Sequence, residues 1–211
     1  MGCVDVLFND KTVTLFVKKQ QNHTTRTLLH PIKGEPTFAK EFKVIQHLDA
    51  EHVGVPNVVF FAQRTVPAGQ QAVLVTENLV GYQSLEVFNE HKVTMPLLQQ
   101  RKLLTSVAKA VRGMHQSGFQ HRSLYAKHIF VKPNGFSFDV VMIDFEKARF
   151  MVFPFVQSLS DLVTLNYRTL GWSRGSRLFF FKQYFGLTSL KCGMKWLVRY
   201  MVQQTTKKLQ K

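Results

Sequence analysis

The chain has 211 residues, enough for one domain or for two small lobes that share an interface. Hydrophobic residues make up 45% of the sequence, which provides for a packed core and argues against global disorder. The formal charge of +15, from 28 basic and 13 acidic residues, suits an anionic partner such as a nucleic acid, a phosphorylated glycolipid or an anionic membrane face.

Targeting and redox signals are few. No apolar run approaches the ~18 residues that a membrane-spanning helix needs. The first ten residues contain Asp5 and Asp10 and no basic region, so they do not predict a secretory signal. Cys3 and Cys192 lack metal-ligand spacing and are interpreted as free thiols in a reducing cytosol.

The N-terminal segment predicts a β-hairpin. Val4–Phe8 and Val13–Val17 are rich in Val, Leu and Phe, and Asn9-Asp10-Lys11 between them supplies turn chemistry. The second strand ends at Lys18 and Lys19. A lysine in this position can reach a nucleotide phosphate, although two solvated lysines at a strand end are the simpler interpretation.

A helix is predicted after a polar loop over His23–Gly34, with Thr37 as its N-cap. Glu41 lies beside the apolar face of this helix. Protein kinases place on such a helix a Glu that pairs with the strand lysine, here Lys18. The alternative is a surface carboxylate that pairs with Lys40 or Lys43. The apolar face consists of Phe38, Phe42, Ile45 and Leu48.

Two further strands are predicted, at Val58–Phe61 and at Ala72–Thr76, where the second run is apolar enough to be buried on both faces. Glu77–Gly81 then leads to a helix from Ser84 onwards. This connector is compatible with a hinge at which adenine bonds to backbone groups, and equally with an ordinary loop between a strand and a helix.

The clearest helix is Pro96–Ser117, which Gly118 closes. The loop that follows reads H-R-S-x-x-x-x-H from His121 to His128. A small hairpin is predicted next, from Ile129-Phe130-Val131 and Val140–Ile143 around a turn at Pro133-Asn134-Gly135, and Asp144 begins the sequence D-F-E at its end.

These two motifs match the frame of a protein-kinase site, in which H-R-D-x-x-x-x-N is the catalytic loop and D-F-G carries the metal-binding aspartate. Ser123 stands in place of the aspartate that acts as the base. Asp144 and His128 are candidate ligands of a divalent metal in a phosphate cleft. The competing interpretation is that Asp144 caps a turn and that His128 is structural.

The C-terminal third predicts helices at Asp161–Leu170, beginning from Ser158 or Ser160, at Arg177–Tyr184 and at Leu190–Gln204. Phe150–Val156 contains Pro154 and is therefore not expected to form a long helix. Gly171–Gly175 is predicted as a loop, and the basic tail Lys207–Lys211 is expected to fray.

The chain resembles the Kdo/WaaP lipopolysaccharide kinase family of Gram-negative bacteria, and within it the InaA branch, from about Leu15 to Phe185. The resemblance implies an α+β, protein-kinase-like fold with two lobes. The N-lobe, residues 1–77, would hold a sheet and the helix of Glu41; the helical C-lobe, residues 78–211, would hold the loop 121–128 and the segment 143–149. The segments that carry the resemblance are Phe16–Gln20, Gly34–Phe42, Gln120–Val131, Ile143–Arg149, Ser160–Arg174 and Arg177–Gly186.

The resemblance also implies roles for single residues. Asp161 would brace the catalytic loop from a helix. The chain departs from the kinase pattern at Ser123, at Glu146, which replaces the glycine of D-F-G, and in the glycine-rich loop, because only Gly2 precedes Lys18. The implied site comprises Ser123, Asp144 and His121 as catalytic residues, Lys18, Glu41 and Glu77 at the nucleotide, and Asp144 with His128 on magnesium.

The implied activity is phosphoryl transfer from ATP, with Mg²⁺, to a sugar of the lipopolysaccharide core or to a related anionic acceptor, by a cytoplasmic protein with peripheral contact at the inner membrane. A general base contributes ~10²–10⁴-fold to rate, so Ser123 predicts a slow enzyme or, alternatively, a pseudokinase that binds nucleotide or a partner. A nucleic-acid-binding domain ranks last, because the basic residues are dispersed and accompany no recognition motif.

Overall fold

The computed structural model describes residues 2–8, 11–25, 34–90, 95–169, 171–189 and 192–209. The chain forms two compact units, Met1–Val80 with Asp144–Glu146, and Gly81–Ile143 with Lys147–Lys211. The predicted turn at Asn9-Asp10 and most of the predicted loop over His23–Gly34 fall outside the described residues.

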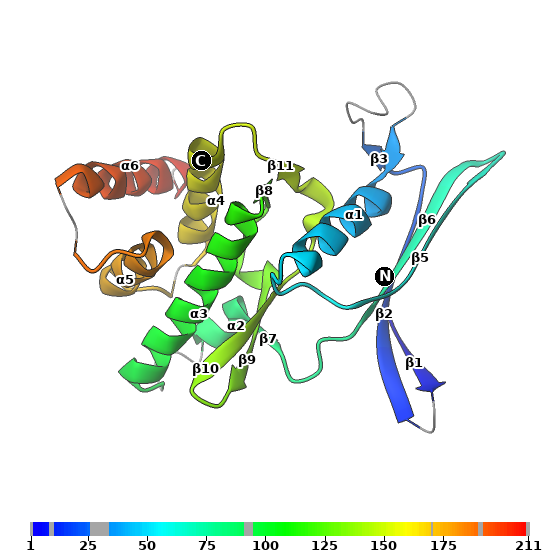
Figure 1. Ribbon diagram of the computed structural model, residues 1–211, viewed down its shortest axis with the longest axis horizontal. Helices are drawn as coiled ribbons and strands as arrows, with labels where there is room; N and C mark the ends of the chain where they lie inside the picture. The colour runs from blue at the N-terminus through cyan, green and yellow to red at the C-terminus, as the bar shows by residue number, and fades with distance from the viewer. Residues whose placement is uncertain are drawn as a thin grey trace. The chain divides into compact units, whose positions relative to one another are not determined.

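The first unit is built on a four-stranded antiparallel sheet in the order β1-β2-β6-β5 (Figure 1). The predicted N-terminal hairpin is confirmed, since β1 pairs with β2 along its whole length. The buried strand predicted at Ala72–Thr76 is the inner strand β6, and Lys18 pairs with Leu74 across it. The strands are β1 (Gly2–Phe8), β2 (Lys11–Gln21), β5 (Val58–Val66) and β6 (Gly69–Glu77), with the short pair β3 (Thr24–Thr25) and β4 (Glu35–Pro36) outside this sheet.

Helix α1 (Thr37–Ala50) packs its apolar face on β5 and β6. The predicted face is confirmed, and Phe42 stacks on Phe61 of β5 with ring centroids 4.4 Å apart. Thr37 is not the N-cap, because Pro36 holds that position and the Thr37 hydroxyl instead contacts Nδ1 of His23 at 3.0 Å. The hydroxyl thereby ties the start of the helix to the strand region before it.

The second unit is mostly helical and contains a three-stranded sheet in the order β10-β9-β7. Its central helix α3 ends at a Ser117 C-cap, and Gly118 follows with a φ of +91°, a conformation that glycine adopts without strain. The elements are β7 (Gln83–Ser84), α2 (Leu85–Glu90), α3 (Leu97–Gln116), β8 (Phe119–Gln120), β9 (Ile129–Asn134), β10 (Ser137–Met142), β11 (Arg149–Phe150), α4 (Pro154–Arg168), α5 (Arg174–Phe185) and α6 (Cys192–Leu209).

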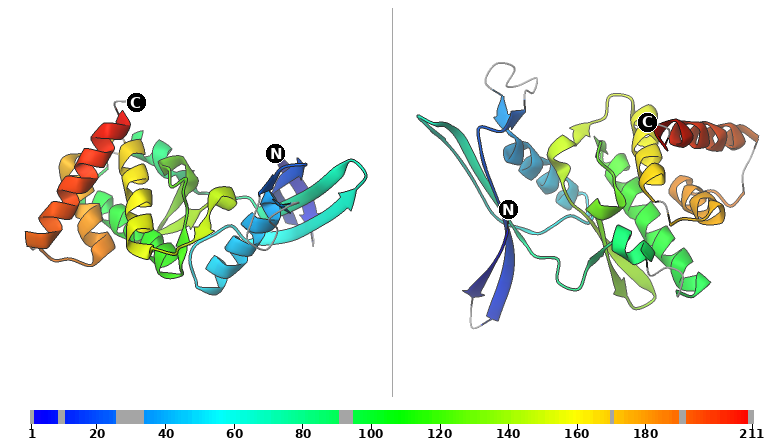
Figure 2. Two further views of the ribbon diagram at one scale, coloured as in Figure 1. Left: turned by 90° about the horizontal axis from the view of Figure 1, so that it is seen from above. Right: turned by 180° about the vertical axis from the view of Figure 1, so that it is seen from behind.

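Helix α3 organises this unit by packing on β10 and on α5, while α4 packs on α6 (Figure 2). The predicted hairpin is confirmed as β9 and β10, with Val131 opposite Val140. Its inner face joins the apolar side of α3 in one core, whose fully buried members include Val107, Val111, Met114, Ile129, Val131 and Met142.

Three helix boundaries differ from the prediction. Helix α4 begins at Pro154 rather than at Ser158 or Ser160, because a proline at the first helical position loses no hydrogen bond and has a suitable φ. Helix α5 begins at Arg174, where the Ser173 hydroxyl accepts a hydrogen bond from the Ser176 amide. Helix α6 continues through Leu209, so the basic tail is helical where described.

No helix in the described ranges is long and apolar enough to cross a membrane. Cys3 is a free, exposed thiol.

Candidate nucleotide and catalytic-loop site

The strand lysine and the helix glutamate meet in the first unit. Nζ of Lys18 lies 2.8 Å from Oε1 and 3.1 Å from Oε2 of Glu41, a bidentate contact. The Lys18 side chain is 14% exposed and the Glu41 side chain 2%. The predicted ion pair is therefore present, and the alternative of a surface carboxylate at Glu41 is wrong.

The neighbouring lysines have other partners. Lys43 forms an ion pair with Glu35, and Nζ of Lys40 donates to the carbonyl oxygen of Glu146 at 3.3 Å. Glu41 is thus left to Lys18, because its place on the buried face of α1 directs it toward the sheet and away from Lys40 and Lys43.

Glu41 carries an electrostatic cost. Burial raises the pKa of its carboxyl above the ordinary value of 4.5, the charge and hydrogen bond of Lys18 oppose that rise, and the carboxylates of Glu146 and Asp144 add to it. Oε1 of Glu41 also accepts a hydrogen bond from the Phe145 amide at 3.3 Å. These contacts gather Lys18, Glu41 and the Asp144–Glu146 segment within one unit.

Asp144 has a φ of +66°, a left-handed conformation that is uncommon for a residue other than glycine. The fully buried Phe145 side chain anchors the backbone next to it. Mg²⁺ in phosphate sites is held by one or two carboxylates together with the phosphates, and the role of Asp144 as such a ligand stays a prediction. Within the described residues, no three His, Cys, Asp or Glu side chains are grouped to hold a metal by themselves.

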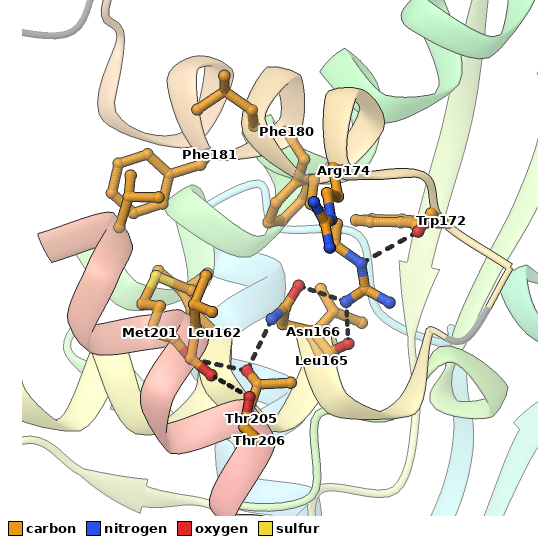
Figure 3. Close-up of a pocket in the computed structure, with 14 residues that line it drawn as sticks. Leu162, Leu165, Asn166, Trp172, Arg174, Phe180, Phe181, Met201, Thr205 and Thr206 are labelled. Carbon is orange, nitrogen blue, oxygen red and sulfur yellow. Dashed lines mark hydrogen bonds between the residues drawn. The ribbon is translucent and has the colours of Figure 1, made fainter. Parts of the chain in front are cut away.

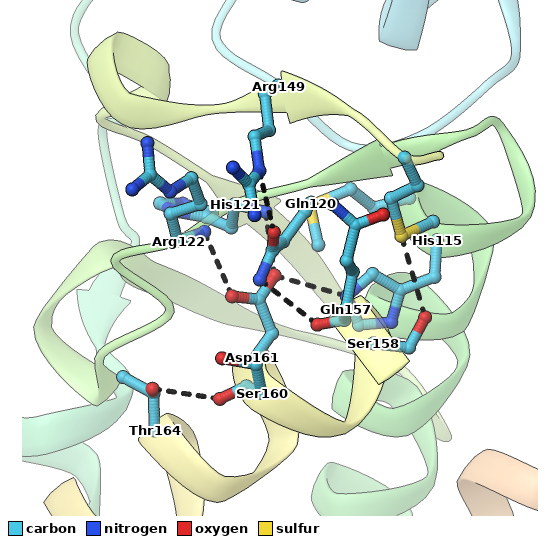
Figure 4. Close-up of polar contacts among 12 residues, drawn as sticks. His115, Gln120, His121, Arg122, Arg149, Gln157, Ser158, Ser160, Asp161 and Thr164 are labelled. Atoms are coloured by element: carbon cyan, nitrogen blue, oxygen red, sulfur yellow. Dashed lines mark hydrogen bonds and ion pairs between the residues drawn. The ribbon is translucent and has the colours of Figure 1, made fainter. Parts of the chain in front are cut away.

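The catalytic-like loop of the second unit is held by Asp161 of α4 (Figure 4). Oδ2 of Asp161 accepts from the His121 amide at 2.6 Å, and Oδ1 accepts from the Arg122 amide at 2.9 Å. Asp161 is almost fully buried, and Arg122 has a left-handed φ of +66°. The bracing that the resemblance implied for Asp161 is therefore present.

The second unit brings together three predicted site residues. Nδ1 of His128 lies 2.8 Å from the Ser123 carbonyl oxygen, and the rings of His121 and His128 stack with centroids 6.0 Å apart. His121 is fully buried, and its Nε2 lies 3.0 Å from the carbonyl oxygen of Ile143, the residue before Asp144. Ser123 is 3% exposed. The catalytic and metal-binding roles of these residues stay predictions.

Glu77 ends strand β6, and its amide donates to the carbonyl oxygen of Asn57 at 2.9 Å. The amide of the following residue, Asn78, donates to the carbonyl oxygen of Thr14 at 2.9 Å. The backbone of the predicted hinge is thus tied to the sheet where it leaves β6, while a contact of Glu77 with adenine stays a prediction.

The contacts of His115 were not predicted from the sequence. Its Nε2 lies 3.2 Å from Oδ2 of Asp161, and its Nδ1 lies 2.7 Å from the Tyr184 hydroxyl. The available signal was its position on the apolar face of α3, where a buried histidine needs polar partners.

A cavity of about 730 Å³ lies among α4, α5 and α6 of the second unit (Figure 3). Its walls are largely apolar, and Arg177 donates to the carbonyl oxygens of Trp172 and Thr169 at one side. The principal apolar side chains are Leu162, Leu165, Phe180, Phe181, Val198 and Met201.

Comparison with known proteins gives concordant matches. The family model of the lipopolysaccharide kinase (Kdo/WaaP) family matches residues 3–184. Protein InaA of Escherichia coli strain K12 is 33% identical over 137 residues, 64% of this chain and 62% of that protein. The lipopolysaccharide core heptose(I) kinase WaaP of Pseudomonas aeruginosa is 30% identical over 156 residues, 69% of this chain and 58% of that protein.

These alignments span only about three fifths of each curated relative. A solved structure of WaaP in complex with acyl carrier protein matches 97% of this chain and 83% of that chain, with a TM-score of 0.71 and 24% identity. This likeness confirms the predicted α+β fold class, with its β-rich N-terminal part and helical C-terminal part.

Proposed function

Because the chain belongs to the lipopolysaccharide kinase (Kdo/WaaP) family, we propose that it binds ATP with Mg²⁺ and transfers a phosphoryl group to a sugar hydroxyl of the lipopolysaccharide core or of a related anionic acceptor. The observation that carries this proposal is the buried Lys18–Glu41 ion pair, to which the Asp144 segment is hydrogen-bonded. In protein kinases the same pair holds the lysine on the nucleotide phosphates.

Each residue has a distinct task in this proposal. Glu41 orients Lys18 toward the phosphates, and Asp144, with His128, holds the magnesium ion, which would neutralise the developing charge of the transferred group. Glu77 marks the hinge at which adenine bonds to the backbone. His121 positions the loop, because its buried ring contacts the carbonyl oxygen of Ile143.

The alternative is a pseudokinase that binds nucleotide or a partner, for example in an envelope or acid-stress response. Ser123 favours it, since a serine hydroxyl is not a general base at neutral pH. Positioning and charge neutralisation provide most of phosphoryl-transfer catalysis, so the loss of the base alone predicts slow turnover rather than none.

The test is calorimetric titration of the protein with ATP, with and without Mg²⁺, followed by turnover on purified core oligosaccharide. We expect magnesium-dependent binding that Asp144→Ala abolishes with the fold intact, because Asp144 lies at a strand end outside the core. Asp139→Ala, which removes a half-buried carboxylate from strand β10 of the second unit, is the matched control. Binding without turnover selects the pseudokinase, and absence of binding by the wild-type protein rejects both forms of the proposal.

We also propose that acyl carrier protein is a partner, because the structurally similar WaaP was solved in complex with one. An acyl carrier protein presents an acyl chain, and the apolar cavity among α4, α5 and α6 is within the size range of small-molecule sites. The high positive charge of the chain suits an acidic partner.

This second proposal is tested by size-exclusion chromatography with acylated and unacylated acyl carrier protein. We expect complex formation with the acylated form, weakened by Val198→Trp inside the cavity and unaffected by Val156→Trp on the exposed side of α4. Equal binding of both forms of the carrier would show that the cavity does not take the acyl chain.

A further inference from the structure

A polar pocket of about 340 Å³ lies in the second unit, beside the residue that precedes Ser123. It is formed by segments distant in sequence: the catalytic-like loop, strand β11, helix α4 and the end of helix α6. Figure 4 shows Arg122 and Arg149 on one side of Asp161, with Ser160 and Thr164 on the other. The side chains that argue for a ligand are Arg122, Arg149, Lys208, Ser160, Thr164 and Tyr167.

The pocket carries three positive charges, from Arg122, Arg149 and Lys208. Among the described residues, no carboxylate lines the pocket. The ion pairs found among those residues do not involve Arg122, Arg149 or Lys208. Asp161 lies nearby, but both of its oxygens already accept backbone amide hydrogens. An uncompensated group of cations in a concave surface attracts an anion.

Hydrogen bonds hold two of the cations in place. Nε of Arg149 donates to Oε1 of Gln120 at 3.1 Å, and Nε2 of the almost fully buried Gln120 donates to the carbonyl oxygen of Gln157 at 3.1 Å. The contact of Arg149 uses only Nε, so its two terminal nitrogens can form a fork that matches a phosphate.

Lys208, near the end of α6, is held by a residue of helix α4. Its Nζ donates to the Thr164 hydroxyl at 3.0 Å, and that hydroxyl donates to the carbonyl oxygen of Ser160 at 2.9 Å. An ammonium group has three donors, so this contact leaves capacity for an anion. The Ser160 and Tyr167 hydroxyls add neutral donors to the same lining.

We propose that this pocket binds the phosphate monoester of a phosphorylated sugar. Three cations suit a dianionic phosphate better than a single carboxylate, and Arg122 places the pocket next to the loop position that would face an acceptor hydroxyl. As an acceptor subsite the proposal rests on the proposed kinase function, whereas the anion site itself rests only on the pocket. The pocket would thus select acceptors that already carry a phosphate.

The test is calorimetric titration, without Mg²⁺ or ATP, with glucose 6-phosphate, glucose and inorganic phosphate. We expect glucose 6-phosphate to bind more tightly than inorganic phosphate, and glucose not to bind. Arg149→Gln should weaken glucose 6-phosphate about tenfold, the loss expected for a charge-assisted hydrogen bond at an open site, and Lys208→Gln about threefold. Lys147→Gln and Lys207→Gln, exposed neighbours outside the lining, should leave the affinity unchanged.

Equal weakening by the control variants, or no binding of either phosphate, would overturn the site. Inorganic phosphate that binds as tightly as the sugar phosphate would overturn the sugar assignment and identify a free-phosphate site. Asp144→Ala separates this proposal from the kinase proposal. It should abolish magnesium-dependent ATP binding and leave glucose 6-phosphate binding intact. The kinase proposal and the pocket proposal can therefore fail separately.

Discussion

Glu41 in the first unit and Asp161 in the second are both buried carboxylates, but different kinds of partner stabilise them. Glu41 faces the side chain of Lys18, together with one amide, from Phe145. Asp161 accepts two backbone amides, from His121 and Arg122, and its Oδ2 also lies 3.2 Å from Nε2 of His115. A side-chain cation can exchange partners when a phosphate arrives, whereas backbone amides cannot do so unless the loop changes conformation. Glu41 is therefore suited to a site where Lys18 binds a phosphate, and Asp161 is suited to holding the loop in one conformation.

The same comparison indicates where the chain departs from an active kinase. The residues that hold the frame, Lys18, Glu41 and Asp161, are present with the expected contacts. Of the three departures seen in the sequence, the one at Ser123 lies on the loop that Asp161 braces. Substitutions can therefore test the residues that hold the site separately from Ser123 at the reacting position.

The largest effect is expected from Asp161→Ala. It would leave two buried amide donors without their acceptor, which costs about 3–5 kcal/mol in the free energy of unfolding. Urea unfolding followed by fluorescence measures this loss. Asp161→Asn should cost less, since its single carbonyl oxygen can still accept from one amide. Asp139→Ala on hairpin β9–β10, which removes only a solvent-exposed hydrogen bond with Asn134, should cost less than about 1 kcal/mol. A loss for Asp161→Ala no larger than that of the hairpin control would show that the brace does not hold the loop.

Ser123→Asp tests the reacting position itself. A restored base should increase turnover of ATP with core oligosaccharide about a hundredfold, the lower end of the ~10²–10⁴-fold range for a positioned base. The lower end is expected because Ser123 is buried, and burial raises the pKa of a carboxyl introduced there. Arg122 can also pair with the new carboxylate and hold it away from the acceptor.

The control for this prediction is Ser123→Asn at saturating Mg²⁺, which has similar size and no charge. A gain restricted to the aspartate variant would show an intact frame that lacks only its base. Equal behaviour of the two variants, with no turnover from either, would mean that the chain is better described as a kinase-fold binding module.

The Lys18–Glu41 pair could be predicted from the sequence, as one of two alternatives, because its signals are local, whereas the bracing by Asp161 was implied only by the family resemblance. The apolar period of residues 37–50 directs Glu41 toward the sheet. Lys18 follows the apolar run Val13–Val17 and lies in strand β2, which continues to Gln21 rather than ending at Lys18 and Lys19. The start of α4 could not be predicted in this way, because a proline inside an apolar run predicts a break in a helix, whereas Pro154 occupies the first helical position.

The polar pocket also could not be predicted from the sequence. Arg122, Arg149 and Lys208 are separated by tens of residues, and only the packing of α4 on α6 and the pairing of β8 with β11 bring them to one surface. Each looked like part of a dispersed positive charge. Long-range tertiary contacts of this kind have no periodic signal along the chain.

A smaller effect is expected when the Lys18–Glu41 pair is broken. Lys18→Met should destabilise the protein by about 2 kcal/mol, because a buried carboxylate loses its cation. The double substitution with Glu41→Gln should recover part of this loss, giving a coupling energy of about 1 kcal/mol in a double-mutant cycle. Both single variants should lose magnesium-dependent ATP binding. Additive unfolding energies would show that the two side chains do not stabilise one another.

The smallest effect concerns pH, because Lys18 opposes the consequence of burying Glu41. The folded protein holds the Glu41 proton more tightly than the unfolded chain does, since the pKa of this carboxyl is raised in the fold. Its contribution to stability is therefore full below pH 4.5 and is lost as the pH rises through the raised pKa. The measurement is the free energy of unfolding of the wild-type protein minus that of Glu41→Gln, at a series of pH values, with Glu51→Gln as the exposed control. We expect this difference to decrease with rising pH for the Glu41 variant. An increase would mean that the attraction of Lys18 outweighs burial, so that the carboxylate is stabilised in its charged form before any nucleotide binds.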